Sequence, residues 1–373
     1  MAKRLWLSTP HMSDEGYELH YIQDAFKKNW IAPLGENVTG FEQDIASFLG
    51  SGFPVALSSG TAALHMSMLL CGVQPGDRVF CQDLTFSASA NPIAYLGAEP
   101  VFIDSERDTW NMDPVALEKA FSLYGKPKAV VVVHLYGNPA KLSELAAICD
   151  THGVPLIEDA AEALGSTYRD RQCGTFGRFS ALSFNGNKII TTSGGGMLIC
   201  SSADEAAHAL KLATQAREPF PWYQHEEIGY NYRLSNVCAG IGRGQARVLP
   251  LRVTQKQAIF ARYAEKLADL PLTMQPVLPE AVSNRWLSVA LLSPGCAIAP
   301  DRVLAALTAD NIEGRHVWKP MHAQPVFEGA HYVKAADVSV SEELFARGVC
   351  LPSDTKMTAV DVDLVCDAIR TAF

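Results

Sequence analysis

Short apolar segments alternate with amphipathic segments along the first 200 residues of the chain. β-Branched apolar runs bounded by Gly, Pro, Asn or Asp predict short buried strands. These runs lie at 79–86, 100–105, 129–137 and 154–160. Segments with apolar residues at helical spacing separate them, at 59–72, 113–125 and 141–153. The alternation of strand and helix predicts an α/β protein with a mostly parallel sheet that helices cover on both faces.

The pattern changes near residue 240. Residues 239–270 read as a long helical stretch that we expect to be interrupted at Pro250. Beyond it, the sequence predicts strands at 284–293 and 314–318, a helix at 301–311 and two further helices towards the C-terminus. We therefore predict a large domain over residues 1–240 and a smaller α+β domain over residues 241–373.

Composition narrows the class of protein. The 373 residues are 48% apolar and 19% charged, which is typical of a well-buried globular chain. The net charge of −9 argues against non-specific nucleic-acid binding, and no stretch approaches the length of a membrane span. Nine scattered cysteines form no CxxC pair, so we expect reduced core cysteines, no zinc or other metal site, and, without a signal peptide, a cytoplasmic location.

The stretch "VALSSGTAALHMSM" (55–68) predicts a short strand that leads directly into a helix. Backbone N–H groups and the helix dipole at such a helix start favour a bound phosphate. The same residues also fit an ordinary capped helix, with Ser59 or Thr61 as the cap. Taken alone, the motif favours the ordinary cap.

The stretch "LIEDAAEALGS" (156–166) places Glu158 and Asp159 at the end of a buried strand. Carboxylates are costly there unless they are paired. Asp159 could simply cap a helix, and a functional carboxylate would need a cation. A protonated pyridine nitrogen would be such a cation.

The stretch "SFNGNKIITTSGGGMLIC" (183–200) surrounds Lys188 with small and polar residues. A partly desolvated lysine can act as an amine nucleophile and form a Schiff base. The glycine triplet at 194–196 permits close approach of a ligand, but it could equally be a plain turn. Pyridoxal 5'-phosphate has a phosphate, a ring nitrogen and an aldehyde, so an anion site, a carboxylate and an amine in one domain match its requirements.

These motifs, in this order, are similar to those of the DegT/DnrJ/EryC1/StrS sugar aminotransferases. The resemblance extends over nearly the whole chain and includes "GDRVFCQDLTFSASANPI", "GAEPVFIDSERDTWNMDP" and "HEEIGYNYRLSNVCAGIGRGQ". It implies a fold-type I, aspartate aminotransferase-like enzyme with a mixed, mostly parallel sheet. The segments "NWIAPLGENVTGFE" and "WKPMH" most resemble UDP-N-acetylbacillosamine-type 4-aminotransferases.

The resemblance implies roles for individual residues. Lys188 is expected to be the catalytic lysine, and Asp159 is expected to pair with the ring nitrogen of pyridoxal phosphate. Glu162, where many relatives carry Gln, should lie near the ring hydroxyl, and the Phe86 ring should stack on the cofactor. The phosphate is expected to be held by Gly60, Thr61, Ala62 and Ser183. The expected substrate contacts are Asn185, Trp318, Lys319 and His322, although His322 could equally be an ordinary loop histidine.

The implied reaction transfers the amino group of L-glutamate to C4 of a UDP-linked 4-keto-6-deoxy sugar. A 3-aminotransferase, a dTDP- or GDP-sugar enzyme and a non-catalytic pyridoxal phosphate-sensing regulator are the alternatives. Asn231 is expected to reach the phosphate site of the neighbouring subunit, which implies a homodimer with shared active sites. One local departure is "TTSGGGM", where relatives often read "TTGEGGM".

Overall fold

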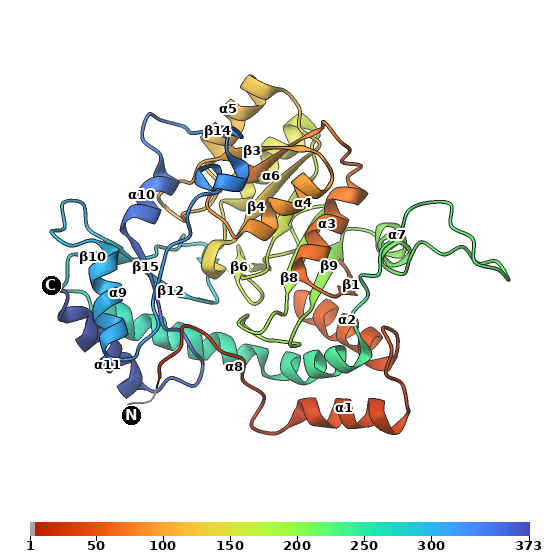
Figure 1. The fold of residues 1–373 in the computed structure, drawn as a ribbon, viewed down its shortest axis with the longest axis horizontal. Coiled ribbons are helices and arrows are strands. Elements are labelled where there is room, and N and C mark those ends of the chain that lie inside the picture. The colour runs from red at the N-terminus through yellow and green to blue at the C-terminus, as the bar shows by residue number, and fades with distance from the viewer. Residues whose placement is uncertain (1–3) are drawn as a thin grey trace.

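The computed structural model describes residues 4–373, so the first three residues of the predicted large domain lie outside the described part. An eight-stranded sheet forms the centre of these described residues (Figure 1). In spatial order its strands are β1 (Phe53–Leu57), β9 (Gly196–Cys200), β8 (Phe179–Ser183), β5 (Leu156–Asp159), β4 (Ala129–Val133), β2 (Arg78–Gln82), β3 (Glu99–Ile103) and β14 (His331–Val333). Strand β9 is antiparallel to both of its neighbours, and the other pairs are parallel. The predicted mixed, mostly parallel sheet is therefore confirmed.

Helices cover both faces of this sheet because successive residues of a strand point to opposite sides. On β2, Phe80 joins one apolar core and Val79 joins the other. The first core receives side chains from α2 (Glu36–Leu49), α5 (Pro114–Tyr124) and α6 (Leu142–His152). The second receives side chains from α3 (Gly60–Leu70), α4 (Asn91–Tyr95) and α7 (Ala203–Ala213).

The long helix α8 (Asn236–Lys266) connects the large sheet to the C-terminal part, and α1 (Tyr17–Lys27) packs along it (Figure 1). The expected interruption at Pro250 is wrong, because the helix continues through this residue. Proline removes one backbone hydrogen bond, but the neighbouring Val248, Leu249 and Arg252 are all buried. Packing on both sides of the proline thus outweighs the lost bond.

A four-stranded antiparallel sheet lies near the C-terminal end of α8. Its spatial order is β10 (Leu272–Met274), β12 (Ser288–Leu292), β15 (Gly348–Leu351) and β13 (Arg315–His316). One apolar core joins this sheet to α9 (Pro300–Ala309) and α11 (Ala359–Arg370), while α10 (Val340–Arg347) directly precedes β15. The remaining strands are short: β6 (Thr167–Tyr168), β7 (Arg171–Gln172) and β11 (Ala281–Val282). Single 3-10 turns lie at Ser87–Ser89, Leu135–Gly137, Met321–Ala323 and Pro325–Phe327.

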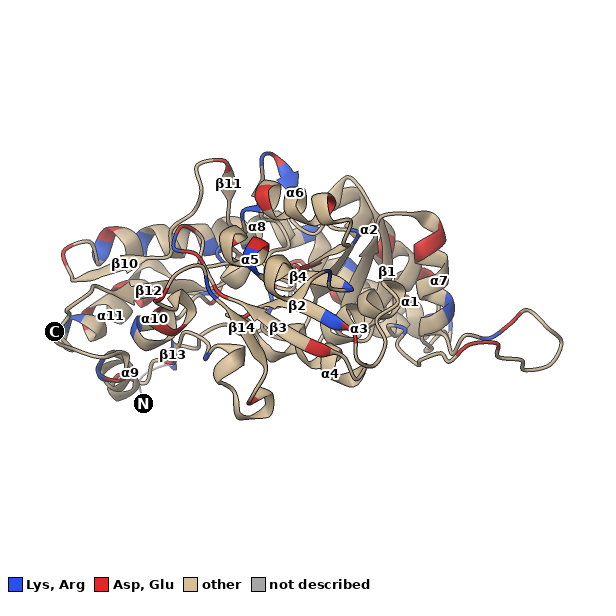
Figure 2. Ribbon diagram, turned by 90° about the horizontal axis from the view of Figure 1, so that it is seen from above, with Lys and Arg blue, Asp and Glu red and all other residues tan. Residues whose placement is uncertain are grey.

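The two halves of the chain are interwoven. Helix α8 spans residue 240, and β14 from the C-terminal half pairs with β3 in the large sheet. The division at residues 240 and 241 therefore stays a prediction. Acidic and basic residues are scattered over the helices and loops (Figure 2). Between residues 4 and 373, no helix combines the length and apolarity needed to cross a membrane.

Candidate active site

A cavity of about 580 Å³ opens at the carboxyl ends of the parallel strands. This edge is where open α/β sheets bind ligands, because strand ends, helix starts and loops converge there. The large-sheet side contributes Ser58, Ser59, Gly60, Thr61, Phe86, Asp159, Glu162, Ser183, Asn185 and Lys188. The opposite side is formed by Leu7, Ser8, Trp286, Leu287, Glu313, Arg315 and Trp318.

One end of the cavity is the N-terminus of α3. The Ser59 hydroxyl oxygen accepts the Ala62 N–H at 3.0 Å, so Ser59 is the cap and Thr61 remains available to line the cavity. A side chain on Gly60 would place its Cβ 3.1 Å from the Ser183 Cβ. The absent side chain lets the helix start approach β8 and leaves N–H groups pointing at one small space. Gly60, Thr61 and Ser183 lie together here, whereas Ala62 is not part of the lining.

The glycine triplet supports this helix start. A Cβ on Gly196, in β9, would overlap the backbone of Ser59 and Gly60. Gly194 and Gly195 line the cavity. Ser193 adopts a left-handed conformation with φ of 73°, at the position where the family pattern has Gly. The departure "TTSGGGM" thus places a serine in a backbone conformation that favours glycine.

Glu158 and Asp159 follow each other on β5 and have separate environments. Glu158 is fully buried, and its carboxylate accepts His134 Nε2 at 3.0 Å and the Gly174 N–H at 2.8 Å. Asp159 faces the cavity, where it accepts the Ser89 hydroxyl at 2.6 Å and the Ala161 N–H at 3.2 Å. Within residues 4–373 no lysine, arginine or histidine forms an ion pair with Asp159. A ligand with a protonated ring nitrogen would supply the missing cation.

Lys188 lies in the loop after β8 and extends into the same cavity. Its Nζ is 3.4 Å from Glu162 Oε1 and 4.2 Å from the centroid of the Trp286 ring. The other Glu162 oxygen accepts the Tyr136 N–H at 2.7 Å. Burial raises the pKa of the Glu162 carboxyl to about 7, although Lys188 and the Tyr136 N–H oppose the rise. The amine is thus held between a carboxyl group and an aromatic face.

The remaining predicted residues divide into two groups. Asn185, Trp318 and Phe86 line the cavity. Phe86 is 57% exposed, and its ring centroid is 5.6 Å from that of the Trp318 ring. An aromatic ring left this exposed at a cavity wall can stack on a planar ligand. Lys319 and Asn231 are exposed and are not part of the lining.

His322 also lies outside the cavity lining. Its Nδ1 is 2.8 Å from Asp83, its Nε2 is 3.2 Å from Glu342, and its ring stacks on Tyr332. Burial lowers the pKa of His322, but the two carboxylates raise it to a net value above the ordinary one. Both ring nitrogens of His322 therefore already have partners within this chain. A substrate contact by His322 stays a prediction.

Sequence reasoning missed several residues of the site. Ser8 and Leu7 lie ahead of α1, Trp286 precedes β12, and Ser89 holds Asp159. Leu7, Ser8 and Trp286 belong to no motif. Ser89 lies within the segment "GDRVFCQDLTFSASANPI", but a single serine carries no spacing signal that would assign it a role. Arg315 lies within the predicted strand at 314–318, and its charge next to "WKPMH" is a signal that could have indicated a site residue.

Comparison with known proteins identifies the family to which this chain is similar over nearly its whole length. The sequence model of the DegT/DnrJ/EryC1/StrS aminotransferase family matches residues 13–370. EpsN of Bacillus subtilis (strain 168), whose name assigns it to the pyridoxal phosphate-dependent aminotransferases, is 51% identical over 381 residues, which cover 100% of this chain and 97% of EpsN. GDP-perosamine synthase of Caulobacter vibrioides is 33% identical and is covered to 97%, with 98% of this chain aligned.

A solved structure agrees with these matches. The aminotransferase TlmJ from Streptoalloteichus hindustanus superimposes with a TM-score of 0.89 at 29% identity. The superposition covers 99% of this chain and 98% of TlmJ. The fold predicted from the resemblance is confirmed.

Proposed function

The chain belongs to the DegT/DnrJ/EryC1/StrS aminotransferase family, and from this premise we propose that it transfers an amino group from L-glutamate to C4 of a UDP-linked 4-keto-6-deoxy sugar. It is a pyridoxal phosphate-dependent sugar aminotransferase. One observation carries the choice of catalytic residues: Lys188, Asp159 and the α3 N-terminus line a single cavity. We take UDP-4-keto-6-deoxy-GlcNAc as the first candidate acceptor.

The residues present fit pyridoxal phosphate. Gly60, Thr61 and Ser183 would hold its phosphate, and Asp159 would pair with its ring nitrogen. Glu162 would face the ring hydroxyl. When bound, the cofactor supplies an electrophilic carbon and a ring that spreads the negative charge developing on a substrate carbon. Ser89 fixes one Asp159 oxygen at 2.6 Å, which keeps the carboxylate oriented towards the cavity.

Lys188 is the group that moves protons in this proposal. Its Nζ removes the proton from Cα of L-glutamate and, in the second half of the reaction, delivers a proton to C4 of the sugar. The Trp286 face 4.2 Å from Nζ excludes water from one side of the amine. Glu162, 3.4 Å away on the same cavity wall, restricts where the amine can lie.

The nucleotide and the aminated carbon distinguish the alternatives. The relative from Caulobacter vibrioides is a GDP-perosamine synthase, which favours a GDP-linked acceptor as the second candidate. A dTDP-linked acceptor and amination at C3 complete the set. A non-catalytic regulator is disfavoured because both Lys188 and Asp159 are present and face one cavity.

We further propose a homodimer whose active sites are shared. Asn231 is exposed and lies outside its own chain's cavity lining, so it is free to serve a partner. The loop over residues 217–229 projects away from the body of the molecule in both views (Figures 1 and 2). Its Trp222, Tyr223 and Ile228 are 61%, 79% and 84% exposed. Apolar side chains this exposed are stabilised when a second copy covers them.

A mixing experiment tests the shared site. Lys188→Ala and Asn231→Ala chains are co-expressed, and hybrid dimers are isolated. If the site is shared, each hybrid contains one doubly damaged site and one intact site, so its activity exceeds the mean of the two mutant homodimers. Activity equal to that mean, or a fully active monomer in sedimentation, would show that each chain builds its own site.

The reaction itself is tested in two steps. Holoenzyme mixed with L-glutamate and no acceptor should release one equivalent of 2-oxoglutarate per subunit, while Lys188→Ala should release none. A panel of UDP-, GDP- and dTDP-linked 4-keto and 3-keto sugars then identifies the acceptor, and NMR of the product identifies the aminated carbon. No release by the wild type would refute the proposed reaction.

We place the reaction in bacterial glycan biosynthesis, since an aminated nucleotide sugar is a precursor for glycosyl transfer. A cytoplasmic location remains part of the proposal. It is supported by the cysteines, which are all unpaired thiols within residues 4–373.

A further inference from the structure

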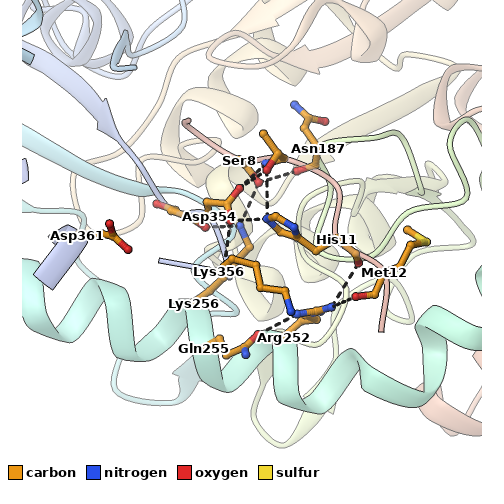
Figure 3. Close-up of polar contacts among 12 residues, drawn as sticks. Ser8, His11, Met12, Asn187, Arg252, Gln255, Lys256, Asp354, Lys356 and Asp361 are labelled. Atoms are coloured by element: carbon orange, nitrogen blue, oxygen red, sulfur yellow. Dashed lines mark hydrogen bonds and ion pairs between the residues drawn. The ribbon is translucent and has the colours of Figure 1, made fainter. Parts of the chain in front are cut away.

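Lys256 of α8 is almost completely buried, with 1% of its surface exposed. Its Nζ donates to the Ser353 carbonyl at 2.7 Å, to the Trp286 carbonyl at 2.9 Å and to the Ser8 hydroxyl at 3.2 Å. The three acceptors belong to the loop after β15, the loop before β12 and the segment ahead of α1. One ammonium group therefore joins three segments that are remote in sequence. Figure 3 shows Lys256 together with Ser8 and Asn187.

Two of these acceptors also bind the residue before Lys188. The Ser8 hydroxyl donates to the Asn187 carbonyl at 3.0 Å, and the Trp286 indole N–H donates to the same oxygen at 2.8 Å. The Trp286 ring in turn faces the Lys188 amine. Lys256 is thus connected to the Lys188 backbone by two parallel routes, each with a single intermediate side chain.

The segment of Ser8, which we call the N-terminal strap (residues 5–13), is held independently. Asp354 accepts the Thr9 N–H at 2.9 Å and contacts His11 Nε2 at 2.5 Å (Figure 3). Arg252 donates to the Met12 carbonyl at 3.0 Å. The backbone of the strap would therefore stay in place without Lys256, but the Ser8 hydroxyl would lose the donor that orients it towards Asn187. Losing this lysine should thus affect Asn187 more than the fold as a whole.

Packing alone does not explain a lysine at this position. A buried ammonium group is costly even when all its N–H groups are bonded, and an apolar side chain of similar length would fill the space at lower cost. Lys256 is not part of the lining of the main cavity, so it does not touch substrate. A space of only about 10 Å³ is lined by both Lys256 and Lys188.

We propose that Lys256 is a positioning residue for Lys188: through Ser8 and Trp286 it holds the Asn187 carbonyl and so determines where the Lys188 amine can reach. The inference rests on the proposed catalytic role of Lys188. A misplacement of about 1 Å at a reacting group can lower turnover by about a hundredfold, which makes such an anchor consequential.

Three variants remove the anchor in different ways. Lys256→Met keeps the length of the side chain and removes all three donors. Ser8→Ala and Trp286→Phe each remove one donor to Asn187 and leave Lys256 in place, so the test survives if Lys256→Met does not fold. Lys141→Met is the matched control, because Lys141 is a partly buried lysine whose ion pairs are with Glu106 and Asp108, away from the cavity lining.

Hydrogen exchange of the holoenzyme gives a readout that does not depend on activity. In Lys256→Met, amides in the peptide 184–192 should exchange about tenfold faster, since the loop loses its anchors, while peptides from β4 and β5 stay unchanged. Turnover with L-glutamate should fall by about tenfold to a hundredfold with KM within about twofold, as expected when only transition-state geometry is lost. Ser8→Ala and Trp286→Phe should shift both quantities in the same direction, and Lys141→Met should shift neither.

Wild-type exchange at 184–192 in folded Lys256→Met, or in both single-donor variants, would overturn the proposal. Lower thermal stability with unchanged kcat would also overturn it, because it would make Lys256 a purely structural residue. A wild-type enzyme that releases no 2-oxoglutarate would refute the proposed function, and the exchange comparison would still decide whether Lys256 anchors the loop.

Discussion

The Glu162 carboxyl should make the stability of the apoenzyme depend on pH in a specific direction. Its pKa is about 7 in the folded chain, against an ordinary value of 4.5. The folded state therefore binds one more proton than the unfolded state between these two values. The stability that this group contributes is complete below pH 4.5 and is lost as the pH rises through 7. A difference of 2.5 pH units at 1.36 kcal/mol each corresponds to about 3 kcal/mol.

Glu162→Gln removes the titration and retains an oxygen that can accept the Tyr136 N–H. We expect the free energy of unfolding of wild type, minus that of the variant, to fall by about 3 kcal/mol between pH 4.5 and 8. Urea unfolding followed by tryptophan fluorescence at fixed protein concentration measures it. The constant offset between the two proteins includes the lost Lys188 contact, so the slope with pH is the informative quantity.

Glu205→Gln serves as a control of opposite sign. Burial favours a higher pKa for Glu205, but Arg178 and Ser201 outweigh it and lower the pKa below its ordinary value. Wild type should therefore lose stability relative to this variant as the pH falls. A wild-type to Glu162→Gln difference that stays flat within about 0.5 kcal/mol would refute the reasoning, as would a titration midpoint of the assigned Glu162 carboxyl carbon near its ordinary value.

Three further substitutions, and Gly194→Ala as the control for one of them, test the rest of the site. Asp159→Asn should lower kcat for 2-oxoglutarate release by at least about a hundredfold, because the ring nitrogen loses its anion, and near-normal kcat would assign that role to another carboxylate. Gly196→Val should lower the free energy of unfolding by about 3 kcal/mol or more and weaken cofactor retention, because its side chain overlaps the backbone of Ser59. Gly194→Ala meets nothing within 4 Å and should leave urea unfolding unchanged, and an equal loss in both variants would contradict this explanation. Phe86→Ala should raise the Kd of pyridoxal phosphate by about tenfold, measured by cofactor fluorescence titration, and an unchanged Kd would exclude stacking.

The order of strands and helices in the large sheet was predictable because each element carries its own periodicity. The runs at 129–137 and 154–160 contain β4 and β5, and the helix at 141–153 contains α6. Pro250 shows where local reasoning fails. Its cost is a property of the residue, but the burial of Leu249 and Arg252 that outweighs it depends on other segments.

The identity of the chemical groups was also determined by the sequence, since an anion site, a carboxylate and a lysine follow one another in one α/β domain. Only the tertiary structure separated Glu158 from Asp159, because neighbouring residues of a strand face opposite sides of the sheet. The pairing of Lys188 with Glu162 and Trp286 joins three segments that no spacing rule relates. The same holds for the strap and Lys256, which reach the catalytic loop through contacts between residues that are 179 and 248 positions apart in the chain. Motifs reveal which chemistry a chain can perform, whereas the contacts that orient those groups arise only when distant segments pack together.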